Sequence, residues 1–246
     1  MKKTPSKYAC SKNLKMPPSL LGGNSLLSKG DAPFPDFLHD KGFYYNGKAF
    51  KLFTFSPLFS PRRKVLKDGL LMEGGIDWFI SSPKEEFVAN LAHGILQQGF
   101  LLLWNQRLLI EQVEVLNQPE FANRMSFRTL SPIVVSTGEK NKAGNLHKKY
   151  LGLEEPESQR ILEENLRRKY IACYDREPSS QGITIKPLRT PQSKLIDYKG
   201  TKIRGWFTHF IAQGNSELIK IGYEAGFGEE NSAGFGMVEL IETKSD

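Results

Sequence analysis

A short sequence near the C-terminus occurs twice: Ala-Gly-Phe-Gly spans residues 225–228 and again residues 233–236. Only Glu229, Glu230, Asn231 and Ser232 separate the two copies. Glycine tolerates positive φ and lets another backbone or a phosphate approach closely. The four glycines therefore predict a polar turn with an open backbone at both ends. The apolar run over residues 236–241 predicts a strand, which places this turn at the edge of a sheet.

Two well-known phosphate-binding patterns do not fit this segment. A Walker loop requires Lys-Ser or Lys-Thr after its last glycine, and neither follows these glycines. The dinucleotide pattern G-x-G-x-x-G fails at its third glycine, where Asn231 stands. Because turns use glycine routinely, a glycine-bracketed hairpin that binds no ligand is as well supported by the residues alone as a ligand-binding loop.

The composition favours a polyanionic partner. The chain has 246 residues, enough for one large or two small domains. Its 34 Lys and Arg against 27 Asp and Glu give a net charge of +7, which suits nucleic acid, with an anionic membrane surface as the alternative. No apolar run approaches the roughly 20 residues of a membrane-spanning helix, and no apolar segment follows Met1-Lys2-Lys3. We therefore expect a cytoplasmic protein without a signal peptide or a membrane partner.

The pattern of apolar residues predicts two similar halves joined near residue 118. The clearest helices are expected over residues 156–174 and from an S-x-x-E capping box at Ser82 to Gly99, with Phe87, Val88, Leu91, Ile95 and Leu96 inward. We expect strands over residues 47–56, 78–81, 100–103, 108–116, 125–137, 183–185, 193–198 and 201–212, a loop over 137–149, and a short helix over 217–224 capped by Asn215 or Ser216. This order predicts an α+β fold of two tandem ferredoxin-like (RRM-like) domains, which span residues 1–117 and 118–246. The first domain lacks a convincing opening strand and first helix, so it is expected to be incomplete at its N-terminus.

Two further segments resemble a known family. Residues 37–43 contain the pattern L-H-x-x-G-[FY], and residues 50–56 match F-x-x-F-x-F-S. Together with the loop G-F-G-x-x-x-x-x-G-F-G, they resemble the CRISPR-associated endoribonuclease family that processes precursor CRISPR RNA, the Cas-six type of the repeat-associated RNA-binding superfamily. The likeness runs from residue 34 to the end of the chain. It implies the tandem ferredoxin-like build, with RNA held across the surface between the halves.

The resemblance also implies a reaction. Family members cut RNA without a metal: the 2′-hydroxyl attacks the adjacent phosphate and leaves a 2′,3′-cyclic phosphate and a 5′-hydroxyl. His39 falls on the catalytic histidine of the family, a residue type suited to proton transfer near neutral pH. Lys48 and Lys51 are candidates for the cation on the crowded phosphate, although either one alone fits a solvated lysine equally well. Cys10 and Cys173 are too few for a disulfide framework or a cysteine metal site, so we expect no cofactor.

Several residues are candidates for RNA contact, although a solvated charge or a core aromatic stays the alternative for each. Strand-borne and turn-borne cations can neutralise phosphates, and Trp206 or Phe227 could stack a base. The candidates are Gly226, Gly228, Gly234 and Gly236 of the loop, Arg128, Lys186, Arg189, Lys202 and Arg204 of the second half, and the basic turn over residues 62–64. We expect bulky residues at Gly234 and Gly236 to weaken RNA binding and to leave the fold largely intact.

Two alternative functions stay open. The family places a helical tyrosine upstream of its histidine, whereas Gly23-Asn24-Ser25-Leu26-Leu27 contains none. A protein of the same fold that binds repeat RNA without cutting it is therefore one alternative, and a structural subunit of a CRISPR effector complex is the other. In each case the expected partner is CRISPR repeat RNA. A homodimer and an association with an effector complex are further expectations.

Overall fold

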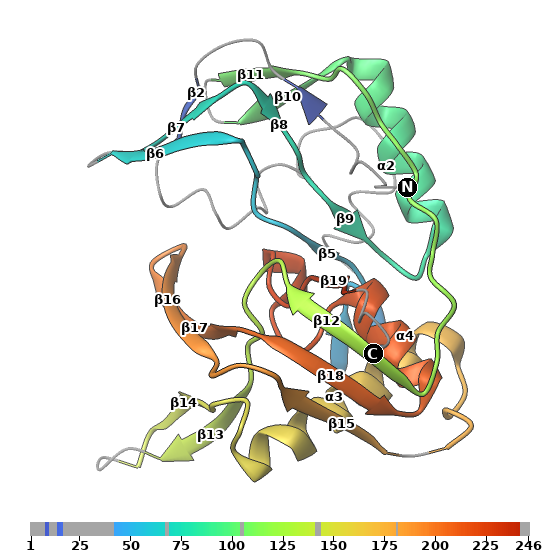
Figure 1. The fold of residues 1–246 in the computed structure, drawn as a ribbon. Helices are drawn as coiled ribbons and strands as arrows, with labels where there is room; N and C mark the ends of the chain where they lie inside the picture. Colours follow the sequence, from blue (N-terminus) through green and yellow to red (C-terminus); the bar gives the residue numbers. More distant parts are fainter. Residues whose placement is uncertain are drawn as a thin grey trace, which may run out of the picture.

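The computed structural model describes residues 42–66, 69–103, 106–140, 144–180 and 182–241, together with the backbone of two short strands, β1 (Tyr8–Ala9) and β2 (Leu14–Met16). The described elements form an upper and a lower half in Figure 1. His39, the histidine implied by the family resemblance, lies outside the described residues.

The second half is built on a four-stranded antiparallel sheet with the strand order β15-β18-β12-β19. Its elements follow each other along the chain as β12 (Arg124–Thr129), α3 (Pro156–Tyr174), β15 (Ile183–Pro187), β18 (His209–Gly214), α4 (Ser216–Ala225) and β19 (Val238–Leu240). Strand, helix, two strands, helix and strand in this order make up the ferredoxin-like unit. Both helices lie on one face of the sheet, behind it in Figure 1.

The longest helix of the second half forms where the sequence predicts it. Pro156 occupies the first turn of α3, where its missing N–H costs nothing, and Asp175 ends the helix in a left-handed conformation. Leu162 and Leu166 of α3 are buried in the same core cluster as Phe127 of β12. Within the described ranges, no helix is long and apolar enough to cross a membrane.

Two additional hairpins extend from the second half, and both differ from the sequence-based prediction. Residues 137–149, predicted as a loop, form the hairpin of β13 (Ser136–Lys140) and β14 (Leu146–Tyr150). The exposed faces of these strands are polar, so they lack the apolar alternation that reveals a strand. The predicted strand over 201–212 divides at Thr208 into β18 and β17 (Thr201–Phe207), and β17 pairs with β16 (Gln192–Tyr198) instead of joining the four-stranded sheet. The predicted strand over 125–137 likewise breaks after Thr129.

In the part of the first half that the structure describes, there are one helix and several small antiparallel ladders. The strands are β3 (Phe43–Tyr45), β4 (Lys48–Phe50), β5 (Thr54–Phe55), β6 (Arg62–Leu66), β7 (Gly69–Glu73), β8 (Gly75–Ile76), β9 (Ile80–Ser81), β10 (Phe100–Leu103) and β11 (Gln106–Leu109), and the helix is α2 (Glu85–Gln98). They pair as β2-β7-β6, β1-β8, β3-β4, β5-β9 and β10-β11. The predicted strand over 108–116 is wrong beyond Leu109, because residues 110–123 have no regular structure.

Helix α2 ends at Gly99 as predicted, but its first turn differs. The N-cap residue is Lys84, and the hydroxyl of Ser82 accepts the N–H of Lys84 and donates to the carbonyl oxygen of Leu52. Ser82 therefore connects two segments of the first half instead of capping the helix. Phe87 and Ile95 are buried as expected, whereas Leu96 is exposed, so the buried stripe is narrower than predicted.

The segment that carries the two candidate lysines packs on the second half of the chain. Leu52 is buried within the core cluster of the second half, and Phe43 and Phe50 pack against that cluster. The hydroxyl of Thr54 donates a hydrogen bond to the carbonyl oxygen of Phe235 at 2.9 Å. This packing determines where the side chains of residues 48–51 lie.

Candidate functional site

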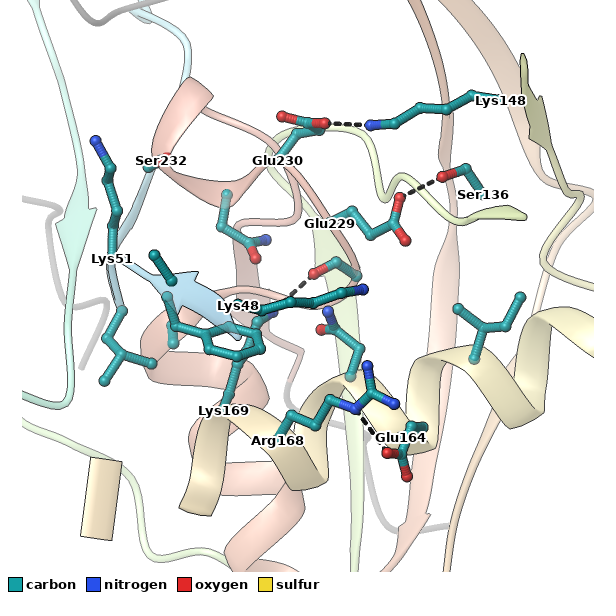
Figure 2. Close-up of a pocket in the computed structure, with 18 of the residues that line it drawn as sticks. Lys48, Lys51, Ser136, Lys148, Glu164, Arg168, Lys169, Glu229, Glu230 and Ser232 are labelled. Carbon is teal, nitrogen blue, oxygen red and sulfur yellow. Dashed lines mark hydrogen bonds and ion pairs between the residues drawn. The ribbon is translucent and has the colours of Figure 1, made fainter. Parts of the chain in front are cut away.

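A cavity of about 650 Å³ lies where residues 48–53 of the first half meet the second half. Its other sides are formed by α3, by the β13–β14 hairpin and by residues 225 and 228–232 (Figure 2). We call residues 226–236 the glycine loop. Both candidate lysines, Lys48 and Lys51, line the cavity together with Gly228. The structure thus brings together the two lysines and residues 228–232 of the glycine loop.

A tight hairpin positions the two lysines. Tyr45 of β3 pairs with Lys48 of β4 across a turn formed by Asn46 and Gly47, whose φ angles are +47° and +72°. Positive φ at both central residues is typical of the turns that join antiparallel strands most tightly. The single strand predicted over residues 47–56 is therefore wrong, because a hairpin and the separate strand β5 replace it. Leu52 also has a positive φ, +49°, and its burial stabilises this unusual backbone.

Carbonyl groups of the glycine loop accept hydrogen bonds from both halves of the chain. Lys169 Nζ of α3 donates to the carbonyl oxygens of Gly226 and Gly228, each at 2.7 Å. Thr54 Oγ1 of β5 donates to the carbonyl oxygen of Phe235. The two Gly-Phe-Gly segments are thus fixed by side chains from both halves of the chain.

The four glycines of the loop have a packing role. Their φ angles lie between +74° and +90°. A Cβ atom would lie 2.4 Å from Asn231 Nδ2 at Gly226, 2.3 Å from Val134 O at Gly228, 2.6 Å from the Phe55 ring at Gly234 and 2.0 Å from Phe227 O at Gly236. Bulky residues at the last two positions would therefore disrupt the fold, and the expectation that they leave it largely intact is wrong. The contact of these glycines with RNA stays a prediction.

Positive charge predominates around the cavity. Its lining contains three glutamates, Glu164, Glu229 and Glu230, against six cations: Lys48, Lys51, Lys148, Arg160, Arg168 and Lys169. Arg168 Nε donates to Glu164 at 2.6 Å, Lys148 Nζ donates to Glu230 at 2.8 Å, and the carboxylate of Glu229 accepts the hydroxyl of Ser136 (Figure 2). An excess of cations in a concave surface attracts phosphate groups.

Sequence reasoning missed Lys169, although the helical period contains the signal. Lys169 lies three residues after Leu166 and directly before Tyr170, so it falls on the buried stripe of α3. Only 4% of its surface is exposed. Burial lowers the pKa of the Lys169 ammonium to about 7, and the nearby carboxylate of Glu229 acts in the opposite direction.

Three of the predicted RNA-binding cations, Arg128, Lys186 and Arg189, lie at the open face of the four-stranded sheet. Arg128 and Lys186 directly follow the core residues Phe127 and Ile185 in their strands, so their side chains point away from α3 and α4. Arg128 forms an ion pair with Glu239, its partner on β19, and lies opposite His209 of β18.

His209 is an unpredicted member of this open face. Partial burial and the guanidinium groups of Arg189 and Arg128 lower its pKa. The structure therefore brings Arg128 and Arg189 together with a histidine that sequence reasoning left unassigned, on the face of the sheet opposite the helices.

The other candidates for RNA contact are separate from both regions. Lys202 and Arg204 are exposed on β17, where Arg204 donates to the hydroxyl of Ser193. Trp206 and Phe227 are buried in the core, and the ring centroid of Phe227 lies 5.2 Å from that of Phe210. Neither ring is accessible to a base, so the predicted stacking role is wrong.

The basic turn predicted over residues 62–64 forms part of β6 and is exposed. Nε of Arg62 lies 3.8 Å from Oε2 of Glu73, with which it forms an ion pair. Among the residues that the structure describes, no three His, Cys, Asp or Glu side chains gather closely enough to hold a metal ion.

Comparison with known proteins identifies the family. The model of the C-terminal part of the CRISPR associated protein Cas6 matches residues 116–240, and the model of the N-terminal part of the CRISPR-associated protein Cas6 matches residues 40–114. This chain belongs to the Cas6 family. The CRISPR-associated endoribonuclease Cas6 of Pyrococcus furiosus is 33% identical over 198 residues, which cover 79% of this chain and 72% of that protein. The CRISPR-associated endoribonuclease Cas6 1 of Methanocaldococcus jannaschii is 33% identical over 205 residues, which cover 82% of this chain and 78% of that protein.

Solved structures extend the similarity to the whole fold. A structure described as a CRISPR associated protein Cas6 superimposes with a TM-score of 0.80 and 28% sequence identity, over 96% of this chain and 98% of the other. The predicted fold is confirmed: this Cas6 family member has two tandem ferredoxin-like domains. The boundary predicted after residue 117 stays a prediction.

Proposed function

We propose that this Cas6 family member is a metal-independent endoribonuclease that cuts CRISPR repeat RNA in precursor transcripts. The observation that carries the proposal is the cavity that Lys48 and Lys51 line together with α3 and residues 228–232 of the glycine loop. The names of its relatives, which are CRISPR-associated endoribonucleases, support the same activity. We include CRISPR repeat RNA as the substrate and the cytoplasm as the location in this proposal.

The proposed reaction needs three groups. A base takes the proton of the 2′-hydroxyl while its oxygen bonds to the adjacent phosphorus, and we assign this role to His39. The bond from phosphorus to the 5′-oxygen breaks, and that oxygen takes a proton from a water molecule, which acts as the acid. Lys48 or Lys51 stabilises the crowded, negatively charged phosphate during the exchange, because a fixed cation acts most strongly where charge develops. The products carry a 2′,3′-cyclic phosphate and a 5′-hydroxyl.

The RNA extends beyond the reacting phosphate in this proposal. The cavity lies on the side of α3, whereas Arg128, Lys186 and Arg189 lie at the open face of the sheet. We assign the open face to the phosphates of a neighbouring part of the RNA, which it neutralises without reading the sequence. Homodimer formation and association with an effector complex stay predictions.

A cleavage assay in EDTA tests the proposal. A 5′-labelled cognate CRISPR repeat RNA is incubated with excess protein, and the ends of the products are mapped. We expect one cut and a cyclic phosphate on the upstream product. His39→Ala should lower the single-turnover rate by about 10²–10⁴-fold, the usual contribution of proton transfer, and leave the affinity unchanged. His93→Ala, which removes an exposed histidine from α2, is the matched control.

The possible results separate the alternatives. Loss of cutting in EDTA would contradict the metal-independent reaction. A wild-type protein that binds the repeat tightly and does not cut it would favour the alternative of a non-cleaving RNA-binding protein. An unchanged rate in His39→Ala would remove His39 from the reaction.

A further inference from the structure

Lys169 occupies an unusual position between the core and the cavity. It follows Arg167 and Arg168 on α3, yet only Lys169 of these three consecutive cations is buried. Burying an ammonium group costs several kcal/mol unless strong partners compensate for the lost water. The buried ammonium group of Lys169 therefore needs strong hydrogen-bond partners.

The partners are two carbonyl oxygens of the glycine loop. Nζ lies 2.7 Å from the oxygens of both Gly226 and Gly228. These carbonyls converge on one nitrogen because both glycines have positive φ, +90° and +78°, which a residue with a Cβ rarely adopts. The first Gly-Phe-Gly segment and the lysine therefore depend on each other.

This contact lies at the wall of the cavity. Gly228 and Lys169 both line it, together with Lys48 and Lys51. Glu229, the next residue of the loop, carries a carboxylate that acts to raise the pKa of Lys169, and an oxygen of this carboxylate accepts the hydroxyl of Ser136. A shift of Gly226 and Gly228 away from α3 would move this side of the cavity relative to the two lysines.

We propose that Lys169 is a positioning residue of the cleavage reaction, whose ammonium group fixes the first Gly-Phe-Gly segment so that the glycine loop and the Lys48–Lys51 segment hold the scissile phosphate between them. This inference rests on the proposed endoribonuclease function. Lys169 acts through the loop and needs no contact with the RNA.

The cost of burying Lys169 favours a functional role over a purely structural one. A neutral donor could satisfy the two carbonyls at a lower desolvation cost, because a buried amide loses less hydration than a buried charge. Burial lowers the pKa of Lys169 to about 7, so the structure retains a lysine whose charged form it disfavours. Strongly perturbed lysines of this kind gather at functional sites.

Lys169→Met tests the assignment, because methionine fills similar space without a donor or a charge. The single-turnover cleavage rate and the Kd for the cognate repeat RNA are measured separately, with a thermal unfolding curve for each variant. We expect the rate to fall by about 10- to 100-fold, the cost of a small misplacement of reacting groups. The Kd should change by less than about threefold, since the interaction acts on the transition state.

Lys84→Met is the matched control. The ammonium group of Lys84 also donates to a backbone carbonyl, that of Cys173 at 2.8 Å, but Lys84 does not line the cavity. We expect this variant to lose stability and to cut at a rate within about threefold of the parent, because its lost hydrogen bond supports the fold only. Equal losses of rate in the two variants would overturn the positioning role.

Lys169→Gln decides the question if Lys169→Met does not fold, because its amide keeps a donor for one carbonyl. A lower rate at unchanged affinity in either folded variant supports the proposal. A parental rate, or a loss of affinity as large as the loss of rate, overturns it. If the wild-type protein does not cut the RNA, the proposed function itself is contradicted. If the wild-type protein cuts and a Lys169 variant cuts equally fast, only the role of Lys169 is contradicted.

Discussion

The hydroxyl of Thr54 donates a 2.9 Å hydrogen bond to the carbonyl oxygen of Phe235, across 181 residues of the chain. Thr54 is fully buried and follows the candidate lysines by a few residues, whereas Phe235 belongs to the second Gly-Phe-Gly segment. The bond therefore joins the segment that follows the two lysines to the glycine loop. Its presence explains how the first half of the chain and the glycine loop keep a fixed relative position.

Thr54→Val should loosen this connection. Valine has the shape of threonine without the hydroxyl, so the change removes the bond and leaves the packing intact. Phe235 O retains a donor, Asn231 Nδ2 at 3.0 Å, so we expect a loss of only about 1 kcal/mol in the free energy of unfolding. Urea unfolding measures this change in the free energy of unfolding. Thr54→Ser, which keeps the hydroxyl, is the control. Equal stability of Thr54→Val and the parent would show that the bond contributes nothing.

Gly236→Ala should damage the fold more than an alanine at another glycine with positive φ. A Cβ at Gly236 would lie 2.0 Å from the carbonyl oxygen of Phe227, whereas Gly200, with a φ of +80°, has open space around it. The left-handed backbone costs alanine about 1–2 kcal/mol at both positions. The additional collision at Gly236 should raise the loss above about 3 kcal/mol, as for other severe core substitutions. Thermal unfolding of the two variants compares them directly, and equal losses would refute the close approach.

The sequence predicted the elements that have strong local signals. Helix α3 has the predicted bounds because Pro156 marks its start and an apolar stripe runs along its length. Asn215 caps α4 as predicted, since its side chain accepts the N–H groups of Glu217 and Leu218. Such signals act between neighbouring residues and so can be recognised without the fold.

Features that depend on distant contacts could not be predicted in this way. The glycine loop indicated a tight backbone, but the partners that require its glycines, such as Phe55 and Val134, are distant in the sequence. Phe227 was a candidate for stacking on an RNA base because no neighbouring residue in the sequence indicates that its ring is buried in the core. The helical period contains the signal for the burial of Lys169, but its carbonyl partners could not be predicted because they lie 57 and 59 residues further along the chain.

Glu217 should make the stability of the protein dependent on pH. Partial burial acts to raise the pKa of Glu217, but hydrogen bonds from Ser179, Tyr170 and Arg176 lower it to about 2 from a usual value of 4.5. The folded state therefore binds the proton less tightly than the unfolded state. The contribution of Glu217 to stability is complete above about pH 4.5 and disappears as the pH falls toward 2.

Glu217→Gln measures this contribution. At pH 7 we expect a loss of about 1–2 kcal/mol in the free energy of unfolding, because hydrogen bonds to a charged group are replaced by weaker ones. The difference from the parent should shrink below pH 4.5. Glu157→Gln, in the first turn of α3, is the control and should change stability little at any pH, since its pairing with Arg160 is exposed. A pH-independent difference for Glu217→Gln would contradict the assignment.

Lys48→Ala and Lys51→Ala should separate the two candidate lysines. Both line the cavity, and the one nearer the phosphate should lower the single-turnover cleavage rate by about 10²–10³-fold, as removal of a group that stabilises developing charge does. The other should act mainly on RNA affinity and its salt dependence. Single-turnover rates and binding curves at two salt concentrations distinguish them. Parental rates in both variants would place the reaction outside this cavity.

A repeat RNA with one 2′-deoxynucleotide immediately before the cut tests the proposed reaction most directly. Deoxygenation removes the attacking group and leaves every phosphate in place, so the affinity should stay the same. In EDTA, we expect the protein to cut the all-ribose RNA once, to leave the deoxy-substituted RNA intact and to bind both equally. Cutting of both RNAs at the same rate would contradict attack by the 2′-hydroxyl, and with it the metal-independent reaction proposed for this cavity.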